Sequence, residues 1–228
     1  MSRKQYLNDM ITFQKKYLPN SPTINDSNND LCSMYLIREN EILLKILSNY
    51  IDKNDQAFID NFLAIYKQYA LAILTKNSSQ VLFLTRMNAE LTLKFVLLLN
   101  DEERNSKSFD KESFRFLKND IKKLRIASED QSKMILTIES YFSEISDLIH
   151  VKNNKVETFE YLSDQITKKG VITDKIRNAF SSFNKAICIL FYRFANVSFG
   201  RLGSDDREKI RMNFKPKKIK KLKKWMAG

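Results

Sequence analysis

The chain contains very few residues that break helices. It has 4 Gly and 3 Pro among 228 residues, well below their usual frequencies of about 7% and 5%. Sheet proteins need both residue types at their tight turns. The scarcity therefore predicts an all-α fold of long helices with few connections. A chain of this length can also bury a sizeable core.

Hydrophobic periodicity predicts a single bundle of about eight helices. Ser78 and Ser79 are the candidate N-caps of the fourth helix, and Gly170 is expected to end the seventh. We expect residues 1–200 to form the bundle, and residues 201–228 to form a short helix and a Lys-rich C-terminal arm. Apolar residues recur every three or four positions in the ranges 2–17, 31–51, 55–76, 79–99, 111–126, 129–150, 157–169 and 173–197, and again in a short helix at 204–213.

Positive charge is concentrated at the C-terminal end. From Arg201 onward there are eleven basic and three acidic residues, so this segment carries +8 of the net charge of +12. A basic block of this kind favours RNA, DNA or anionic lipid as a partner. The candidate nucleic-acid-binding residues are Lys215, Lys217, Lys218, Lys220, Lys221, Lys223, Lys224 and Trp225.

The basic segment has three interpretations. As a flexible arm it would bind backbone phosphates without sequence preference, with Trp225 stacking on a base. As a helix it would place Ile219, Leu222, Trp225 and Met226 on one side. That pattern is also typical of a helix lying on a membrane surface. The third interpretation is a solvated tail that aids solubility.

The range 79–99 is the most apolar in the chain and is expected at the centre of the bundle. Its charged residues Arg86, Glu90 and Lys94 follow one another at intervals of four and therefore share one stripe. The stripe either lines a possible cleft, with Arg86 and Lys94 gripping phosphates, or forms a self-neutralising row of ion pairs.

His150 is the only histidine of the chain. Ser143, Asp147 and His150 fall at i, i+4 and i+7 of a predicted helix, on one face. Asp147 is placed to orient the imidazole for general acid–base catalysis. The alternative is a histidine favoured by the dipole at a helix C-terminus.

Other sequence signatures of catalytic or cofactor sites are not found. The sequence shows no glycine-rich phosphate loop, no Gly-x-Ser-x-Gly elbow and no zinc-type cluster, so we expect no cofactor and no metal site.

Two segments resemble the HEPN family. Residues 88–98 place Glu90 and Lys94 four apart before a run of leucines, and residues 141–150 resemble the helix that carries the histidine of that family. The resemblance implies an all-α core at about 79–150, often dimeric, in bacterial defence or toxin systems. Many members are metal-independent ribonucleases with an Arg before the histidine. Here the corresponding positions hold Ser143, Glu144 and Ile145.

These observations predict a nucleic-acid-binding accessory or effector protein of a bacterial defence or toxin-type system, and they favour binding over catalysis. A divergent ribonuclease using His150, Asp147 and Ser143 is the alternative, and a peripheral membrane protein is the third. A partner protein or a homodimer is expected. The polar N-terminal residues and the lack of an apolar run of roughly 18 residues predict a cytoplasmic location, in which Cys32 and Cys188 stay free.

Overall fold

The computed structural model describes residues 2–24, 27–100, 114–124, 128–150 and 170–227. Within these ranges every regular element is helical and there is no strand, so the all-α prediction is confirmed. None of the described helices is long and apolar enough to cross a membrane. The main helices are α1 (Arg3–Tyr17), α2 (Asn28–Leu47), α3 (Gln56–Leu74), α4 (Ser78–Leu98), α5 (Phe114–Lys123), α6 (Glu129–His150), α8 (Asp174–Ala186), α9 (Ser204–Asn213) and α10 (Pro216–Met226).

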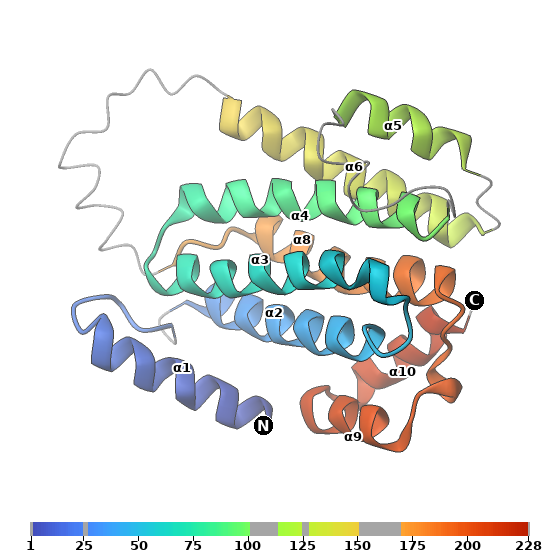
Figure 1. The fold of residues 1–228 in the computed structure, drawn as a ribbon. Coiled ribbons are helices and arrows are strands. Elements are labelled where there is room, and N and C mark those ends of the chain that lie inside the picture. Colours follow the sequence, from blue (N-terminus) through green and yellow to red (C-terminus); the bar gives the residue numbers. More distant parts are fainter. Residues whose placement is uncertain (1, 25–26, 101–113, 125–127, 151–169, 228) are drawn as a thin grey trace.

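Helices α2, α3, α4, α6 and α8 surround the core (Figure 1). Helix α3 packs against both α2 and α4, and α8 contacts α2, α4 and α6. Aromatic rings fill the centre: the ring of Phe95 lies 5.6 Å from that of Phe58 and 4.7 Å from that of Phe191. Burial of these large side chains is the main stabilising contribution of the bundle.

Helix α4 occupies the central position that its apolar composition predicts, since it packs against α3, α5, α6 and α8. Two details differ from expectation. Its N-cap is Asn77, whose side chain accepts a hydrogen bond from the Gln80 amide, and not Ser78 or Ser79. One side is also open to solvent, because Phe83 and Met87 are exposed and Leu91 is only half-buried.

The predicted helix at 173–197 changes geometry partway along. The α-helix α8 ends at Ala186 and continues as a π-helical segment, η4 (Ile187–Tyr192), which is fully buried. Such wider turns are uncommon. Here the Tyr192 hydroxyl donates to the Leu43 carbonyl at 2.6 Å, and this bond ties η4 to α2.

The expected helix at 157–169 lies outside the described residues, but Gly170 is described. A Cβ at Gly170 would lie 2.4 Å from Ser27 Oγ and 2.8 Å from Ser27 Cβ, so the Ser27 side chain lies too close to this backbone for any residue but glycine. The next two residues, Val171 and Ile172, donate their amide hydrogens to the buried carboxylate of Asp30.

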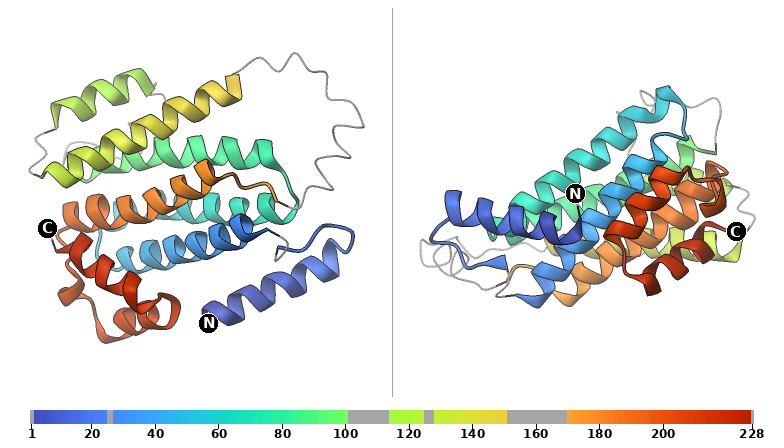
Figure 2. Two further views of the ribbon diagram at one scale, coloured as in Figure 1. Left: turned by 180° about the vertical axis from the view of Figure 1, so that it is seen from behind. Right: turned by 90° about the horizontal axis from the view of Figure 1, so that it is seen from below.

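The C-terminal segment is not a flexible arm. Residues 216–226 form the helix α10, whose Leu222 and Met226 side chains are buried. Figures 1 and 2 show α9 and α10 together at the end of the bundle where α2 ends. Of the three interpretations, the helix with Ile219, Leu222, Trp225 and Met226 on one side is the one found, because this apolar side packs against α9 and η4.

Candidate nucleic-acid interface

Helix α10 is held in place by its apolar side. Leu222 is 0% exposed and Met226 is 2% exposed, and Ile219 and Trp225 pack against the same core. Pro216 occupies the first turn, where its fixed φ favours helix initiation and its missing amide costs nothing. The spacing of these apolar residues by three and four positions therefore matches a helix with one side packed on the core.

The opposite side of α10 carries lysines. Lys217, Lys220, Lys221 and Lys224 are exposed, and their spacing of three and four places them on one face, called the lysine face below. This face extends over about 10 Å of helix axis. Among the described residues, no ion pair with a carboxylate involves these four lysines. Lys223 is exposed beside this face, and Lys215 is exposed at the N-cap of the helix, where its charge acts on Glu39.

Lys218 points the other way and belongs to the docking contact. Its Nζ lies 3.9 Å from Glu39 Oε2 on α2, and Arg3 Nη1 of α1 lies 3.8 Å from Glu39 Oε1. Burial raises the pKa of Glu39, and the charges of Lys218 and Arg3 only partly oppose this. Burial also lowers the pKa of Lys218. Lys218 is therefore a structural contact, unlike the exposed lysines with which the sequence grouped it.

Trp225 is engaged within the protein. The indole is half-buried, Lys218 Nζ lies 5.0 Å from its ring centroid, and Arg193 Nε donates to the Trp225 carbonyl at 2.7 Å. A cation at this position satisfies a carbonyl at the end of the helix. Stacking of Trp225 on a base would compete with these contacts and stays a prediction.

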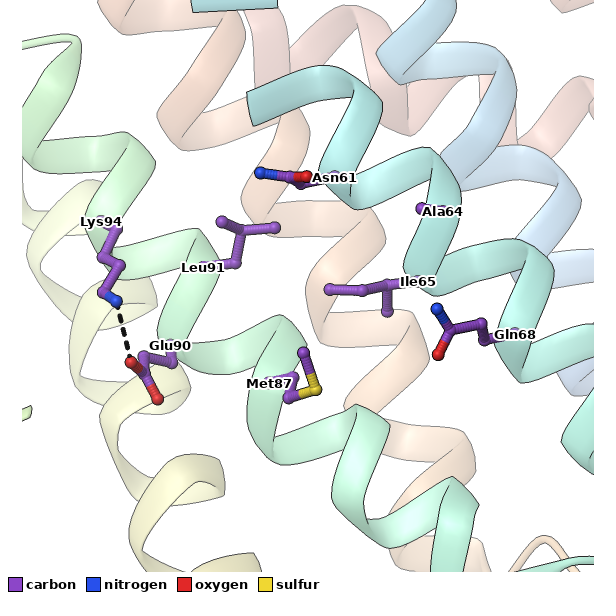
Figure 3. Close-up of a pocket in the computed structure, with 8 residues that line it drawn as sticks. All are labelled: Asn61, Ala64, Ile65, Gln68, Met87, Glu90, Leu91 and Lys94. Atoms are coloured by element: carbon purple, nitrogen blue, oxygen red, sulfur yellow. Dashed lines mark ion pairs between the residues drawn. The ribbon is translucent and has the colours of Figure 1, made fainter. Parts of the chain in front are cut away.

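The charged residues of the stripe on α4 contact different neighbours. Glu90 and Lys94 form an ion pair of 3.0 Å at the edge of a groove between α3 and α4, which has a volume of about 360 Å³ (Figure 3). Arg86 instead reaches α6, where its Nε donates to Ser146 Oγ at 2.9 Å and its guanidinium lies 4.9 Å from the Phe142 ring centroid. The three side chains therefore do not line one cleft.

The candidate catalytic residues lie on the last two turns of α6. Ser143 and Asp147 are exposed, and His150 is the last residue of the helix, with a side chain outside the described residues. Glu144, one of the positions where the HEPN family has Arg, pairs with Lys175 at 2.6 Å, and hydrogen bonds from Lys175 and Ser140 lower its pKa. Groups of three or more His, Cys, Asp or Glu that could hold a metal are not found within the described part of the chain.

A pocket between α2 and α9 was missed by the sequence reasoning. Its volume is about 250 Å³, and α2 contributes its floor while α9 forms the opposite wall. The two helices are far apart in the chain, and no local motif signals their meeting. The lining residues are Arg38, Ile42, Lys45, Ile46, Lys209, Met212 and Asn213.

The HEPN resemblance still depends on the two sequence segments quoted above. Comparison with protein-family models, with curated proteins and with solved structures finds no match to this chain.

Proposed function

We propose that this protein binds nucleic acid through the lysine face of α10. The observation that supports the proposal is a row of exposed lysines on a helix that is docked rather than free. Like charges three and four residues apart repel one another on a helix, and a helix this short is marginal in water without tertiary contacts. The docking contacts of Leu222 and Met226 hold the charges together.

A preformed row of cations suits a polyanion. Phosphates spaced along a nucleic-acid backbone would neutralise the lysines, and the release of condensed counterions would favour the complex. Because the lysine side chains are flexible and contact phosphates as point charges, this binding is expected to be largely independent of sequence.

The docked state of α10 favours nucleic acid over a bilayer as partner. A membrane-surface helix inserts its apolar side into the lipid, but the apolar side of α10 packs against the protein. Membrane binding through this helix would require it to leave the bundle.

The wider role that we propose is that of an accessory or effector protein in a bacterial defence or toxin-type system, acting with a partner protein or as a homodimer. The resemblance of residues 88–98 and 141–150 to the HEPN family supports this part of the proposal.

The test replaces charge without touching the docking side. The variant Lys217→Gln, Lys221→Gln, Lys224→Gln is compared with the control Lys53→Gln, Lys67→Gln, Lys122→Gln, which removes equal charge from other exposed positions. Binding to duplex DNA and to RNA is measured by anisotropy at several salt concentrations. The first variant should bind more weakly, with a slope of log affinity against log salt that is smaller by about 2–3. If both variants lost the same affinity for nucleic acid, binding would depend on net charge alone, and the proposed interface would be refuted.

A ribonuclease is the second candidate, supported by the position of Arg86. Its bond to Ser146 places a cation one helical turn before His150. RNA cleavage in the presence of EDTA by the wild type, lost in His150→Ala and Arg86→Gln, would support this function. A loss of about 10²–10⁴ in rate is expected for removal of a general acid–base group.

A further inference from the structure

Helices α3 and α4 expose apolar side chains on the same side of the bundle. On α4, Phe83, Met87 and Leu91 follow one another at intervals of four, and the first two are 47% and 38% exposed. On α3, Leu71 is 48% exposed and Ala64 is also exposed. Apolar side chains scattered singly over a surface are normal, whereas a contiguous group of them marks an interaction surface.

The groove of about 360 Å³ between the two helices joins these side chains into one surface. Figure 3 shows Met87 of α4 and Gln68 of α3 directed toward each other across it. Leu71 and Phe83 lie one helical turn nearer the connection between the helices and extend the two walls. This surface, called the α3–α4 face below, comprises Ala64, Gln68, Leu71, Phe83, Met87 and Leu91.

The α3–α4 face carries no net charge. Glu90 and Lys94 neutralise each other at the edge formed by α4, through their ion pair of 3.0 Å. Asp60 and Lys67 are exposed at the edge formed by α3. Arg86 is turned toward α6 by its hydrogen bond to that helix. Because the chain as a whole carries +12, a second copy can approach this neutral face with less repulsion than it meets at the basic surfaces.

The α3–α4 face is also complementary to itself. If two copies place their α4 helices antiparallel about a two-fold axis at Met87, positions at equal distances from Met87 meet. Phe83 of each copy then contacts Leu91 of the other, and the two Met87 side chains contact each other. The charged positions of α4 all face uncharged ones, and Lys94, for example, faces Gln80.

We propose that two copies of this chain associate through the α3–α4 face, with α4 of each copy seated in the groove of the other. The face extends roughly 16 Å along each helix and about 20 Å across the pair, a projected area of about 300 Å². A stable interface has about 800 Å² per partner. The dimer is therefore expected to be weak and reversible.

This dimer leaves both lysine faces free. Seen from below in Figure 2, α2 and α8 lie between α3 and α10, so the α3–α4 face and the lysine face belong to different sides of the molecule. The consequence for binding rests on the proposed function. A nucleic acid long enough to reach both copies is held twice, and the second contact is intramolecular. The dimer therefore favours long polyanions over short ones.

Analytical ultracentrifugation tests the association directly. The mass of the wild type should rise from 26.8 kDa toward twice that value as concentration increases from about 5 to about 500 µM, a range suited to a small interface. Met87→Glu places two carboxylates together at the axis and should weaken dimerisation at least about 100-fold. The control Leu136→Glu adds the same charge at a 63% exposed position of α6 and should dimerise like the wild type.

Cross-linking locates the contact without adding charge to it. The background variant is Cys32→Ser, in which the remaining Cys188 is buried. Met87→Cys then places one thiol of each copy beside the axis, so a short bis-maleimide should join the two copies. The matched control Leu136→Cys should give little cross-linked dimer, because α6 lies outside the proposed interface.

A wild type that stays monomeric at the highest concentration would overturn the interface. Unchanged dimerisation of Met87→Glu, or equal cross-linking of the two cysteine variants, would also overturn it. These outcomes are separate from nucleic-acid binding. If the dimer fails while the lysine-face variant still binds more weakly, the proposed function stands; if the dimer forms while that variant binds normally, the interface stands and the proposed function fails.

Discussion

At the scale of single residues, Glu39 is the most informative side chain. It is a buried carboxylate between Arg3 of α1 and Lys218 of α10, and it therefore joins three helices. Burial raises its pKa above the ordinary value of 4.5. The folded protein consequently holds a proton on Glu39 more readily than the unfolded chain does, so this group makes the protein less stable as pH rises from 4.5 through the folded pKa.

Replacing Glu39 with Gln should remove this pH dependence. We expect the free energy of unfolding of Glu39→Gln to increase relative to that of the wild type as pH rises from about 4, because the wild type loses stability over this range, and the difference should level off near neutrality. Urea denaturation at pH 4, 5.5 and 7 measures the difference. The exposed Glu208→Gln serves as the control. A difference that did not change with pH would show that Glu39 titrates normally in the folded protein.

The second prediction at this scale concerns the buried ion pair of Asp30 and Lys76, whose carboxylate and Nζ lie 2.9 Å apart. Both side chains are almost fully buried. Asp30→Asn removes the carboxylate that pairs with the buried Lys76 ammonium, and this should cost about 3–5 kcal/mol in the free energy of unfolding.

The double variant Asp30→Asn, Lys76→Met should recover part of that loss, because it also removes the buried ammonium charge. Both variants are measured by urea denaturation. A loss below about 1 kcal/mol in Asp30→Asn would mean that the pair is not desolvated in solution.

At the scale of elements, α10 depends on its apolar side. Leu222→Ala should destabilise the protein by about 2–5 kcal/mol, since it leaves a cavity beneath a docked helix. The neighbouring Lys221→Ala is exposed and should change stability by no more than about 0.5 kcal/mol.

Trp225 is the only tryptophan in the chain, so its fluorescence reports the docking of α10 directly. Leu222→Ala should red-shift its emission well before global unfolding. If Leu222→Ala and Lys221→Ala had the same free energy of unfolding, α10 would not be docked on the bundle in solution.

The elements also show what the sequence could and could not predict. Periodicity located α1, α4, α6 and α9 closely, because their apolar residues repeat clearly and face a core. For the C-terminal segment it gave a helix with Ile219, Leu222, Trp225 and Met226 on one side, but it could not decide between a docked helix and a free arm, because that depends on contacts with α9 and η4. The pocket between α2 and α9 depends on tertiary packing alone, so no local pattern predicts it.

At the scale of the whole molecule, a buried polar network sets the register of four helices. The Tyr66 hydroxyl of α3 accepts hydrogen bonds from Asn40 Nδ2 of α2 at 3.1 Å and from Asn88 Nδ2 of α4 at 3.2 Å. Asn184 Nδ2 of α8 donates to Asn40 Oδ1 at 2.8 Å. Buried polar groups of this kind favour one packing arrangement over its alternatives.

Tyr66→Phe should therefore cost about 1–3 kcal/mol, because it leaves two buried amide donors unpaired without changing the shape of the core. Thermal and urea denaturation measure the loss. The control Tyr17→Phe alters an exposed hydroxyl and should have no effect. If Tyr66→Phe did not change the free energy of unfolding, the side-chain amides of Asn40 and Asn88 would have found other hydrogen-bond partners.

The docking of α10 has a consequence for the chemistry of Cys188. Helix α10 packs against η4, and the Cys188 thiol of η4 is fully buried, with a pKa that burial raises to about 12. A thiol that is neither exposed nor ionised near neutral pH is inert towards alkylating reagents. The rate at which Cys188 is alkylated in the folded protein would therefore report how often this end of the bundle opens.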